Sequence, residues 1–383
     1  MMVKFKWLYR LLLCGAAFLC IVACDNAPGL SDDMDRNTLT VLDFNIWHGL
    51  NPKGIFRFDE YETKAERQIR LQGFIEQARN LKADIIFLQE VNPAPGLTRY
   101  LAKTLGMDSV YILDNAGLKI GAVGLPVNFR SGLAILAKKD LGLRKVGKKK
   151  LSGPFGGTSR ALSFQYSEFR YALAAKVTVA GETVLLINTH LHHGNEMSPS
   201  YAKAIEKLVS EGTISQERAD QVTAIAHSAS HRRRGELSRA ISMANKHGFQ
   251  DLPTLFAGDF NASPDSPEIT WLTNSLAFAS VTNDEDPSTL LLTWDTKRNP
   301  YTHLLEDFQP ANAFEAFALE HFKEQVIGES RRLDYIFTRN ISGFLQVEGA
   351  GLFGDTPHRG RMISDHFGIY AKFRMLAGGS RKN

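Results

Sequence analysis

Four hydrophobic runs of this chain each end in a side chain that can bind a metal ion or form a hydrogen bond. "TVLDFN" ends at Asn45, "DIIFLQE" at Glu90, "VLLINTH" at His190, and "TLFAGDFN" at Asp259 and Asn261. Each polar residue, taken alone, could cap a turn or a helix, as Asp and Asn commonly do. Glu and His are poorer caps, however, and in α/β sheets ligands gather beyond the carboxyl ends of strands. The repetition therefore predicts one convergent site made by several strands.

The apolar runs also predict the fold class. Helical patterns lie between several of them, notably Tyr61–Asn80 and a long polar stretch, Tyr201–Lys246. Alternating strands and helices indicate a layered α/β fold. Because there is no internal repeat and no second Pro/Gly-rich linker, we expect one continuous domain over residues 38–376 and a short tail at 377–383. The expected strands are "TLTVLDFN", "ADIIFLQE", "GLAILAK", "YALAAKVTV", "TVLLINTH", "TLFAGDFN", "RLDYIFT" and "FGIYAKF".

The N-terminus is typical of an export signal. Its apolar run, Leu11–Ala23, is too short to span a bilayer comfortably and follows basic residues. "IVAC" resembles the lipobox of bacterial lipoproteins, which predicts lipidation of Cys24; the alternative is an ordinary secretion signal that leaves a free thiol. We therefore expect a lipoprotein signal peptide at residues 1–23 and a tether at 24–37. The protein would be exported and lipid-anchored to a bacterial membrane, with the choice between inner and outer membrane open.

The charge balance argues against a large nucleic-acid surface. The formal net charge is +4, and removal of residues 1–23 takes away three basic residues and no acid, which leaves +1. A nucleic-acid partner normally requires a clear positive surface. Two local basic runs, Lys138–Lys150 and His231–Arg239, remain. Such runs are usually solvated faces, and contact with anionic phospholipid or a polynucleotide is the alternative.

The order of the motifs resembles a known family. The four runs above, together with "SGLAIL", "RRLDYIF" and "SDHFGIY", resemble the endonuclease/exonuclease/phosphatase superfamily in sequence order from Thr38 to about Arg374. The resemblance implies a four-layer α/β sandwich, in which helices flank two facing mixed β-sheets. It also implies hydrolysis of phosphate esters with a divalent cation.

The resemblance places the metal near Asn45 and Glu90, with Asp365 of "SDH" next to it. These oxygen ligands suit Mg²⁺, which keeps several waters and needs few protein ligands; Mn²⁺ is the alternative, and one or two ions remain open. A zinc site is disfavoured because no cysteine lies beyond position 24 and "THLHH" has no matching His/Cys cluster.

The resemblance also assigns the catalytic roles. Asp259 orients or deprotonates the attacking water, and Asn261 holds water or phosphate beside it. His366 contacts the phosphoryl group, best as a cation, and Asp334 fixes its imidazole. For Asp334 the alternative is a buried ion pair with one of the arginines that precede it in "RRLDYIF". His190 of "NTHLHH" resembles the deoxyribonuclease-like and sphingomyelinase-like branches, because AP endonucleases have asparagine there.

Three further residues are candidates for binding substrate. Arg130 and Arg170 begin strand-like runs, and the planar guanidinium of arginine can bond two phosphate oxygens at once. Asn299 lies in "TWDTKRNPY", which resembles a loop bordering the active site in sphingomyelinase-type relatives, although it could instead anchor that loop. His192 and His193 are ambiguous between a catalytic part and solvent exposure.

Three functions follow as hypotheses. The first is an extracytoplasmic, membrane-anchored phosphodiesterase that uses in-line water attack, with phospholipid or sphingomyelin-like head groups as the leading substrates. The second is a secreted or periplasmic Mg²⁺-dependent endonuclease or exonuclease. The third is a non-catalytic binding lipoprotein. No protein partner is inferred.

Overall fold

The computed structural model describes residues 37–51, 59–60, 62–116, 129–153, 156–158, 163–165, 169–246, 248–282, 290–302, 313–323 and 328–376. The expected signal peptide, Cys24, nearly all of the tether and the tail at 377–383 lie outside these residues. Among the described helices, none is long and apolar enough to cross a membrane.

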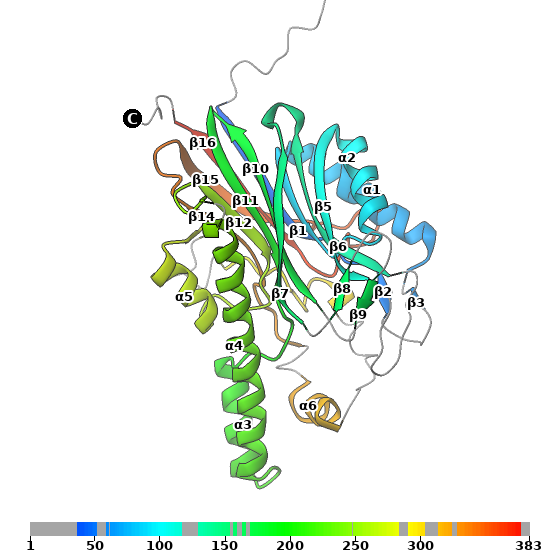
Figure 1. The fold of residues 1–383 in the computed structure, drawn as a ribbon. Helices are drawn as coiled ribbons and strands as arrows, with labels where there is room; N and C mark the ends of the chain where they lie inside the picture. The colour runs from blue at the N-terminus through cyan, green and yellow to red at the C-terminus, as the bar shows by residue number, and fades with distance from the viewer. Residues whose placement is uncertain are drawn as a thin grey trace, which may run out of the picture. The chain divides into compact units, whose positions relative to one another are not determined.

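Two six-stranded mixed sheets form the centre of the domain (Figure 1). The first sheet has the order β15-β16-β1-β4-β6-β5 and the second the order β13-β14-β12-β11-β10-β7. The strands of the first are β1 (Thr38–Asn45), β4 (Ile85–Gln89), β5 (Met107–Ala116), β6 (Arg130–Lys138), β15 (Leu345–Phe353) and β16 (Gly368–Met375). Those of the second are β7 (Arg144–Ser152), β10 (Arg170–Val179), β11 (Glu182–His190), β12 (Thr254–Asp259), β13 (Ala279–Ser280) and β14 (Asp334–Arg339).

Each sheet contains one parallel pair at its centre. β1 runs parallel to β4, and β11 runs parallel to β12, whereas the remaining pairings within both sheets are antiparallel. Parallel neighbours end at the same edge of a sheet. The four runs with polar ends are these two parallel pairs.

Helices cover the outer faces of both sheets (Figure 1). One apolar cluster fills the space between the sheets. A second lies between the first sheet and helices α1 (Lys64–Leu81) and α2 (Ala94–Leu105). A third lies between the second sheet and helices α4 (Gln216–Lys246) and α5 (Pro267–Leu276). This four-layer α/β sandwich confirms the expected fold class.

Smaller elements complete the described part of the chain. Helix α3 (Pro199–Ser210) packs on α4 and forms a fourth apolar cluster with Phe322 of α6 (Ala313–Lys323). The others are β2 (Leu50–Asn51), β3 (Asp59–Glu60), β8 (Gly156–Thr158), β9 (Ser163–Gln165) and the short helix η1 (Lys139–Leu141).

All eight expected strands are present. The expected helix at Tyr61–Asn80 begins instead at Lys64, because Thr63 caps it: its hydroxyl accepts from the Glu66 backbone and the Glu66 carboxylate accepts from the Thr63 backbone. The polar stretch Tyr201–Lys246 divides into α3 and α4.

Candidate active site

The strand register brings the polar ends of the two parallel pairs to one edge of their sheets. In the first sheet Asn45 lies opposite Gln89, so Glu90 follows directly beyond the edge. In the second sheet Asp259 lies opposite both His190 and Asp334. The site is therefore built at the carboxyl ends of β1, β4, β11 and β12.

Asn45 joins the two halves of the site. Its amide nitrogen Nδ2 lies 3.2 Å from Glu90 Oε1 and 3.1 Å from Asp259 Oδ2. Its oxygen Oδ1 accepts from the backbone N–H of Trp47, at 3.1 Å. Asn45 is fully buried, so one fixed amide spans the gap between a carboxylate of the first sheet and one of the second.

Asp259 is the centre of the second half. Its Oδ2 lies 3.4 Å from His190 Nε2 and 3.8 Å from His366 Nε2, and its Oδ1 accepts from the Asn261 backbone at 2.9 Å. The other ring nitrogen of His366, Nδ1, lies 2.8 Å from Asp334 Oδ2. Asp334 therefore pairs with His366, as the resemblance implies.

Three residues of the site have a left-handed backbone. Trp47, Glu90 and Asn261 have φ values of 55°, 56° and 49°. Asn tolerates this region, but for Trp and Glu it carries a strain of about 1–3 kcal/mol that the surrounding structure must hold. The strain lies where the chain leaves β1, β4 and β12 and aims side chains into the site.

The electrostatics of the site show a surplus of negative charge. Burial, and after it the carboxylate of Asp334, raises the pKa of Asp259 to about 7. Burial raises the pKa of Asp365 to about 6, and the nearby Glu90 adds to this effect. In both groups burial is the larger cause, and a neighbouring carboxylate adds to it.

The histidines act in the opposite direction. Burial alone would raise the pKa of Glu90, but the nearby imidazoles, His48 first, lower it to about 2. Burial alone would lower the pKa of His366, but Asp334 and Asp259 raise it well above the ordinary value. The pairing with Asp334 therefore favours the cationic form of His366.

Two groups of residues could hold a divalent cation. One is the set Asn45, Glu90 and Asp365. The other is Asp259, Asp334 and His366, whose ligand atoms lie within 4.8 Å of one another. In the second set the Asp334 carboxylate is already paired with His366 at 2.8 Å. In the first set Glu90 and Asp365 offer hard carboxylate oxygens, which fits a divalent cation better, while Asn45 turns its amide nitrogen toward Glu90 and its oxygen toward the Trp47 backbone.

Sequence reasoning missed His48. Its backbone N–H donates to Glu90 Oε2 at 3.2 Å, and its ring Nε2 lies 3.5 Å from the same oxygen. Its Nδ1 accepts from the Leu50 backbone at 2.9 Å, which fixes the ring orientation. His48 lies three residues after Asn45, in the same segment "NIWH", and this position was the available indication that it belongs to the site.

Arg70 of α1 was also missed. It is buried and bonds both oxygens of Glu62, at 2.8 and 2.7 Å. The same guanidinium donates to the carbonyl oxygens of Ile46, Trp47 and Ile363. Arg70 therefore ties the segment after β1 to the segment before Ser364. Nothing in the local sequence of this helix reveals such a contact.

The substrate-binding candidates lie around this edge. Arg130 begins β6 at the level of Asn92, to which its backbone N–H donates at 2.9 Å. Arg170 is buried at the start of β10, with Nη2 3.1 Å from His193 Nδ1. Asn299 is also buried, and its Nδ2 donates to the Ser364 carbonyl at 2.9 Å, an anchoring contact for its loop.

The roles of both remaining histidines depend on helix α4. The backbone N–H of His192 donates to Glu236 Oε2 at 2.8 Å, and the rings of His192 and His193 lie 5.3 Å apart. Because His193 contacts the buried Arg170, both rings belong to the border of the site.

This fold and this arrangement of carboxylates, amides and a His–Asp pair define the class of hydrolases that act on phosphate esters. A sequence profile of the Endonuclease/Exonuclease/phosphatase family matches residues 44–366. The chain therefore belongs to that family, whose members are hydrolases of phosphate esters. A search of curated protein sequences finds no match.

Solved structures show the same fold. The endonuclease/exonuclease/phosphatase from Bacteroides vulgatus has a TM-score of 0.53 and 14% identity, covering 88% of this chain and 99% of that one. The human Nocturnin catalytic domain with bound sulfate has a TM-score of 0.52 and 15% identity, covering 89% and 96%. A D. rerio TDP2 humanized by 14 mutations has a TM-score of 0.51 and 18% identity, covering 88% and 99%.

Proposed function

We propose that the chain is an extracytoplasmic, membrane-anchored, Mg²⁺-dependent phosphodiesterase that acts on phospholipid or sphingomyelin-like head groups. The observation that carries the catalytic part is the Asn45 amide, which contacts Glu90 on one side and Asp259 on the other, while His190 and His366 face Asp259. Glu90 and Asp365 would hold the cation, Mg²⁺ or alternatively Mn²⁺, and the Asn45 amide would fix the Glu90 carboxylate beside it. When bound, the cation supplies positive charge against the phosphate oxygens.

The residues of the chain then have separate tasks. Asp259 accepts a proton from the water that attacks phosphorus in line with the leaving oxygen. His366, kept cationic by Asp334, donates a hydrogen bond to a phosphoryl oxygen on which negative charge accumulates. Asn45 and Asn261 fix the position of Asp259 by contacts at both of its oxygens.

The preference for a lipid substrate rests on the N-terminus and on charge. Acylation at Cys24 would concentrate the enzyme at a membrane surface. The expected mature chain is nearly neutral. Of the run His231–Arg239, Arg233 is buried in an ion pair with Glu268 and Arg232 pairs with Glu236, so these charges serve the fold.

A nuclease remains the second candidate because of the edge strand β7. Arg144, Lys145, Lys148 and Lys149 are exposed on it. Its register with β10 places Ser152 beside Arg170 at the active-site end and Arg144 beside Lys176 at the opposite end. The basic row therefore runs away from the site, which weakens this candidate.

One assay separates these functions. The full chain in detergent micelles is incubated with Mg²⁺ and labelled sphingomyelin, phosphatidylinositol or plasmid DNA. Release of a phosphorylated head group without nicking supports the proposal, whereas nicking alone supports the nuclease. Absence of turnover in a folded sample would leave the non-catalytic binding lipoprotein.

Matched variants test the site in the same assay. Glu90→Ala and His366→Ala should each remove most turnover in samples whose circular dichroism shows the native fold. Arg374→Ala is the control, since Arg374 is exposed on the last strand and pairs with Glu348. Turnover at the wild-type level in either site variant would show that the centre is misplaced.

A further inference from the structure

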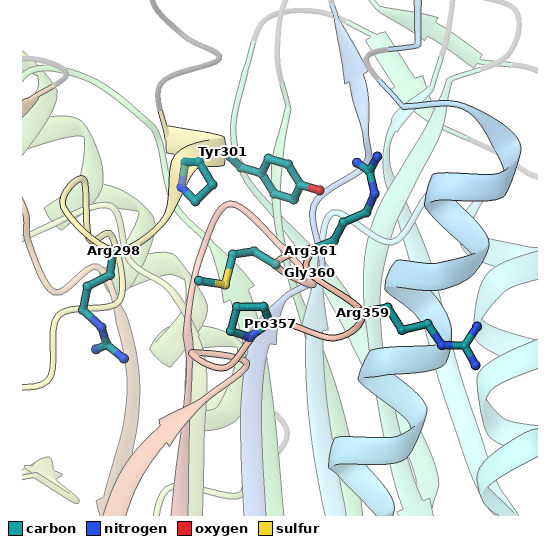
Figure 2. A pocket seen from close by; sticks show the side chains of 8 residues that line it. Arg298, Tyr301, Pro357, Arg359, Gly360 and Arg361 are labelled. Atoms are coloured by element: carbon teal, nitrogen blue, oxygen red, sulfur yellow. The ribbon is translucent and has the colours of Figure 1, made fainter.

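An open cavity of about 650 Å³ lies between residues 298–301 and residues 357–362. We call it the arginine cavity, because Arg298, Arg359 and Arg361 line it together with Tyr301, Pro357 and Met362. Figure 2 shows Arg298 and Arg359 on opposite sides of the cavity in that view. Its volume lies within the range of ordinary ligand sites, about 300–1,000 Å³.

Residues in and next to the lining of the arginine cavity contact the segments that carry catalytic residues. The ring of Tyr301 packs against that of Trp47 with centroids 5.1 Å apart, and Trp47 donates to Asn45. Asn299, two residues before Tyr301, holds the Ser364 carbonyl. A ligand in this cavity would therefore lie next to the segments that carry Asn45 and His366.

Ion pairs hold two of the three arginines of the cavity. Arg298 pairs with Asp355 at 2.7 Å, and Arg361 pairs with Glu66 at 2.6 Å. Arg361 also hydrogen-bonds Tyr301. Arg359 is exposed and has no ion pair among the described residues. Arg298 also lies 3.9 Å from Asp295, so three carboxylates face the three guanidinium groups, and Arg359 is the one left for an anionic ligand.

The loop that carries Arg359 and Arg361 is fastened to α1. Gly73 makes a close approach possible: a Cβ on it would lie 2.6 Å from His358 Cβ. Around this contact, Gln77 Nε2 donates to the Thr356 carbonyl at 3.1 Å, and Arg70 donates to the Ile363 carbonyl at 3.0 Å. The loop is therefore held in a fixed position before any ligand arrives.

The backbone at Arg359 is strained. His358 and Arg361 exchange two backbone hydrogen bonds, of 2.8 and 3.0 Å, so Arg359 and Gly360 are the central pair of a tight turn. Their φ values are 50° and 77°. Turns with two positive φ values favour Asn, Asp or Gly at the first central position. An arginine in this place is unfavourable for the turn, and strain of this kind gathers at functional sites.

We propose that the arginine cavity binds a second phosphate group of the substrate, beside the ester that is cleaved; this inference rests on the proposed function. The planar guanidinium forms two parallel hydrogen bonds to phosphate oxygens, which suits Arg359 to this ligand. The scissile phosphate itself belongs with His190, His366 and Asp259, so the group in the cavity is a different one. Tyr301 and Pro357 offer apolar surface to the linker between the two phosphates.

The test compares diesters that differ by one phosphate. The full chain with Mg²⁺ is given p-nitrophenyl alkyl phosphates, with propyl or octyl chains, that either end in a methyl group or carry a terminal phosphate. We expect KM to be about tenfold lower for the phosphorylated member of at least one pair, which corresponds to about 1.4 kcal/mol. Arg359→Gly should abolish this preference and raise the unfolding midpoint, because glycine relieves the positive φ.

Control variants and a binding measurement separate this inference from the proposed function. Arg374→Ala should keep the preference, and Arg359→Lys should restore part of it. Calorimetric titration of the alkane bisphosphates and alkyl monophosphates in EDTA needs no turnover: wild type should bind the bisphosphates more tightly, and Arg359→Gly should not. Absence of diester hydrolysis would refute the proposed function, while the titration would still decide this inference.

Two results would overturn the inference. One is equal affinity of the wild type for mono- and bisphosphates at both chain lengths. The other is an unchanged preference in Arg359→Gly. If the preference holds, titration of a short oligonucleotide and of anionic phospholipid vesicles against both proteins identifies the source of the second phosphate, as the ligand whose affinity falls in Arg359→Gly.

Discussion

Arg70 gives the sharpest test of how the site is held together. We expect Arg70→Met to lower the free energy of unfolding by about 3–5 kcal/mol, the usual cost of removing one partner of a buried ion pair. The variant would remove the two contacts of 2.7 and 2.8 Å to the buried Glu62 carboxylate, leave it the longer one of 3.6 Å to Arg67, and leave three carbonyl oxygens without this donor. Against a typical total of about 5–15 kcal/mol, this loss is large.

Equilibrium urea unfolding, followed by far-UV circular dichroism, measures this loss. Arg79→Met is the matched control, because Arg79 lies on the same helix but is exposed and makes one bond, to the Thr104 carbonyl. It should cost less than about 1 kcal/mol. A double-mutant cycle with Glu62→Gln should give a coupling of more than about 1 kcal/mol. Equal losses in Arg70→Met and Arg79→Met would refute the reasoning.

Three further predictions concern the acid–base pair, the cation and the strand contact. First, the pKa of His366 in the folded state lies above its unfolded value of 6.5. Its charge therefore stabilises the protein fully below about pH 6.5, and this stability is lost as the pH rises through the folded-state pKa. Asp334→Asn should flatten this pH dependence of unfolding, measured in EDTA, and an unaltered profile would contradict the pairing. Second, Mg²⁺ at about one hundred times its Kd should raise the free energy of unfolding of the wild type by about 2.7 kcal/mol, and EDTA should reverse this. The same increase in the double variant Glu90→Ala/Asp365→Ala would place the cation elsewhere. Third, a Cβ on Gly258 would lie 2.1 Å from the Thr189 carbonyl oxygen, so Gly258→Ala should destabilise the fold by about 1–3 kcal/mol. Gly343→Ala is the control, because a Cβ there meets nothing within 4 Å. Equal urea midpoints of the two variants would show that β11 and β12 can separate freely.

The sequence predicted the central strands and missed the outer ones. β5 and β15 are the two edges of the first sheet, and β7 and β13 are the two edges of the second. An edge strand pairs on one side and is partly exposed, so it lacks the continuous apolar run by which a central strand is recognised. β7 has the sequence "RKVGKKKLS", and its lysines suggested a solvated surface. The lysines correctly indicated that β7 is exposed, but they did not indicate that it pairs with β10.

The site was predictable where chemistry lies at strand ends and unpredictable where it depends on distant contacts. Asn45, His190 and Asp259 follow apolar runs, and the parallel pairing of those runs brings them together. Arg70 and His48 act through Ile363 and Glu90, contacts that only the folded chain creates. Arg359 could not be recognised either, since its importance comes from a turn closed by His358 and Arg361. The signal peptide, the lipidated Cys24 and the tether remain predictions.

The Asn45 amide is a strut between two β-sheets, since it holds Glu90 from one and Asp259 from the other. A hydrogen bond of about 3 Å is lost when the donor and acceptor move apart by even a part of an ångström. A small displacement of one sheet relative to the other would thus stop the proposed catalysis, although every strand stayed intact. Enzymatic rate would then serve as a gauge of interlayer spacing finer than any measure of helix and strand content.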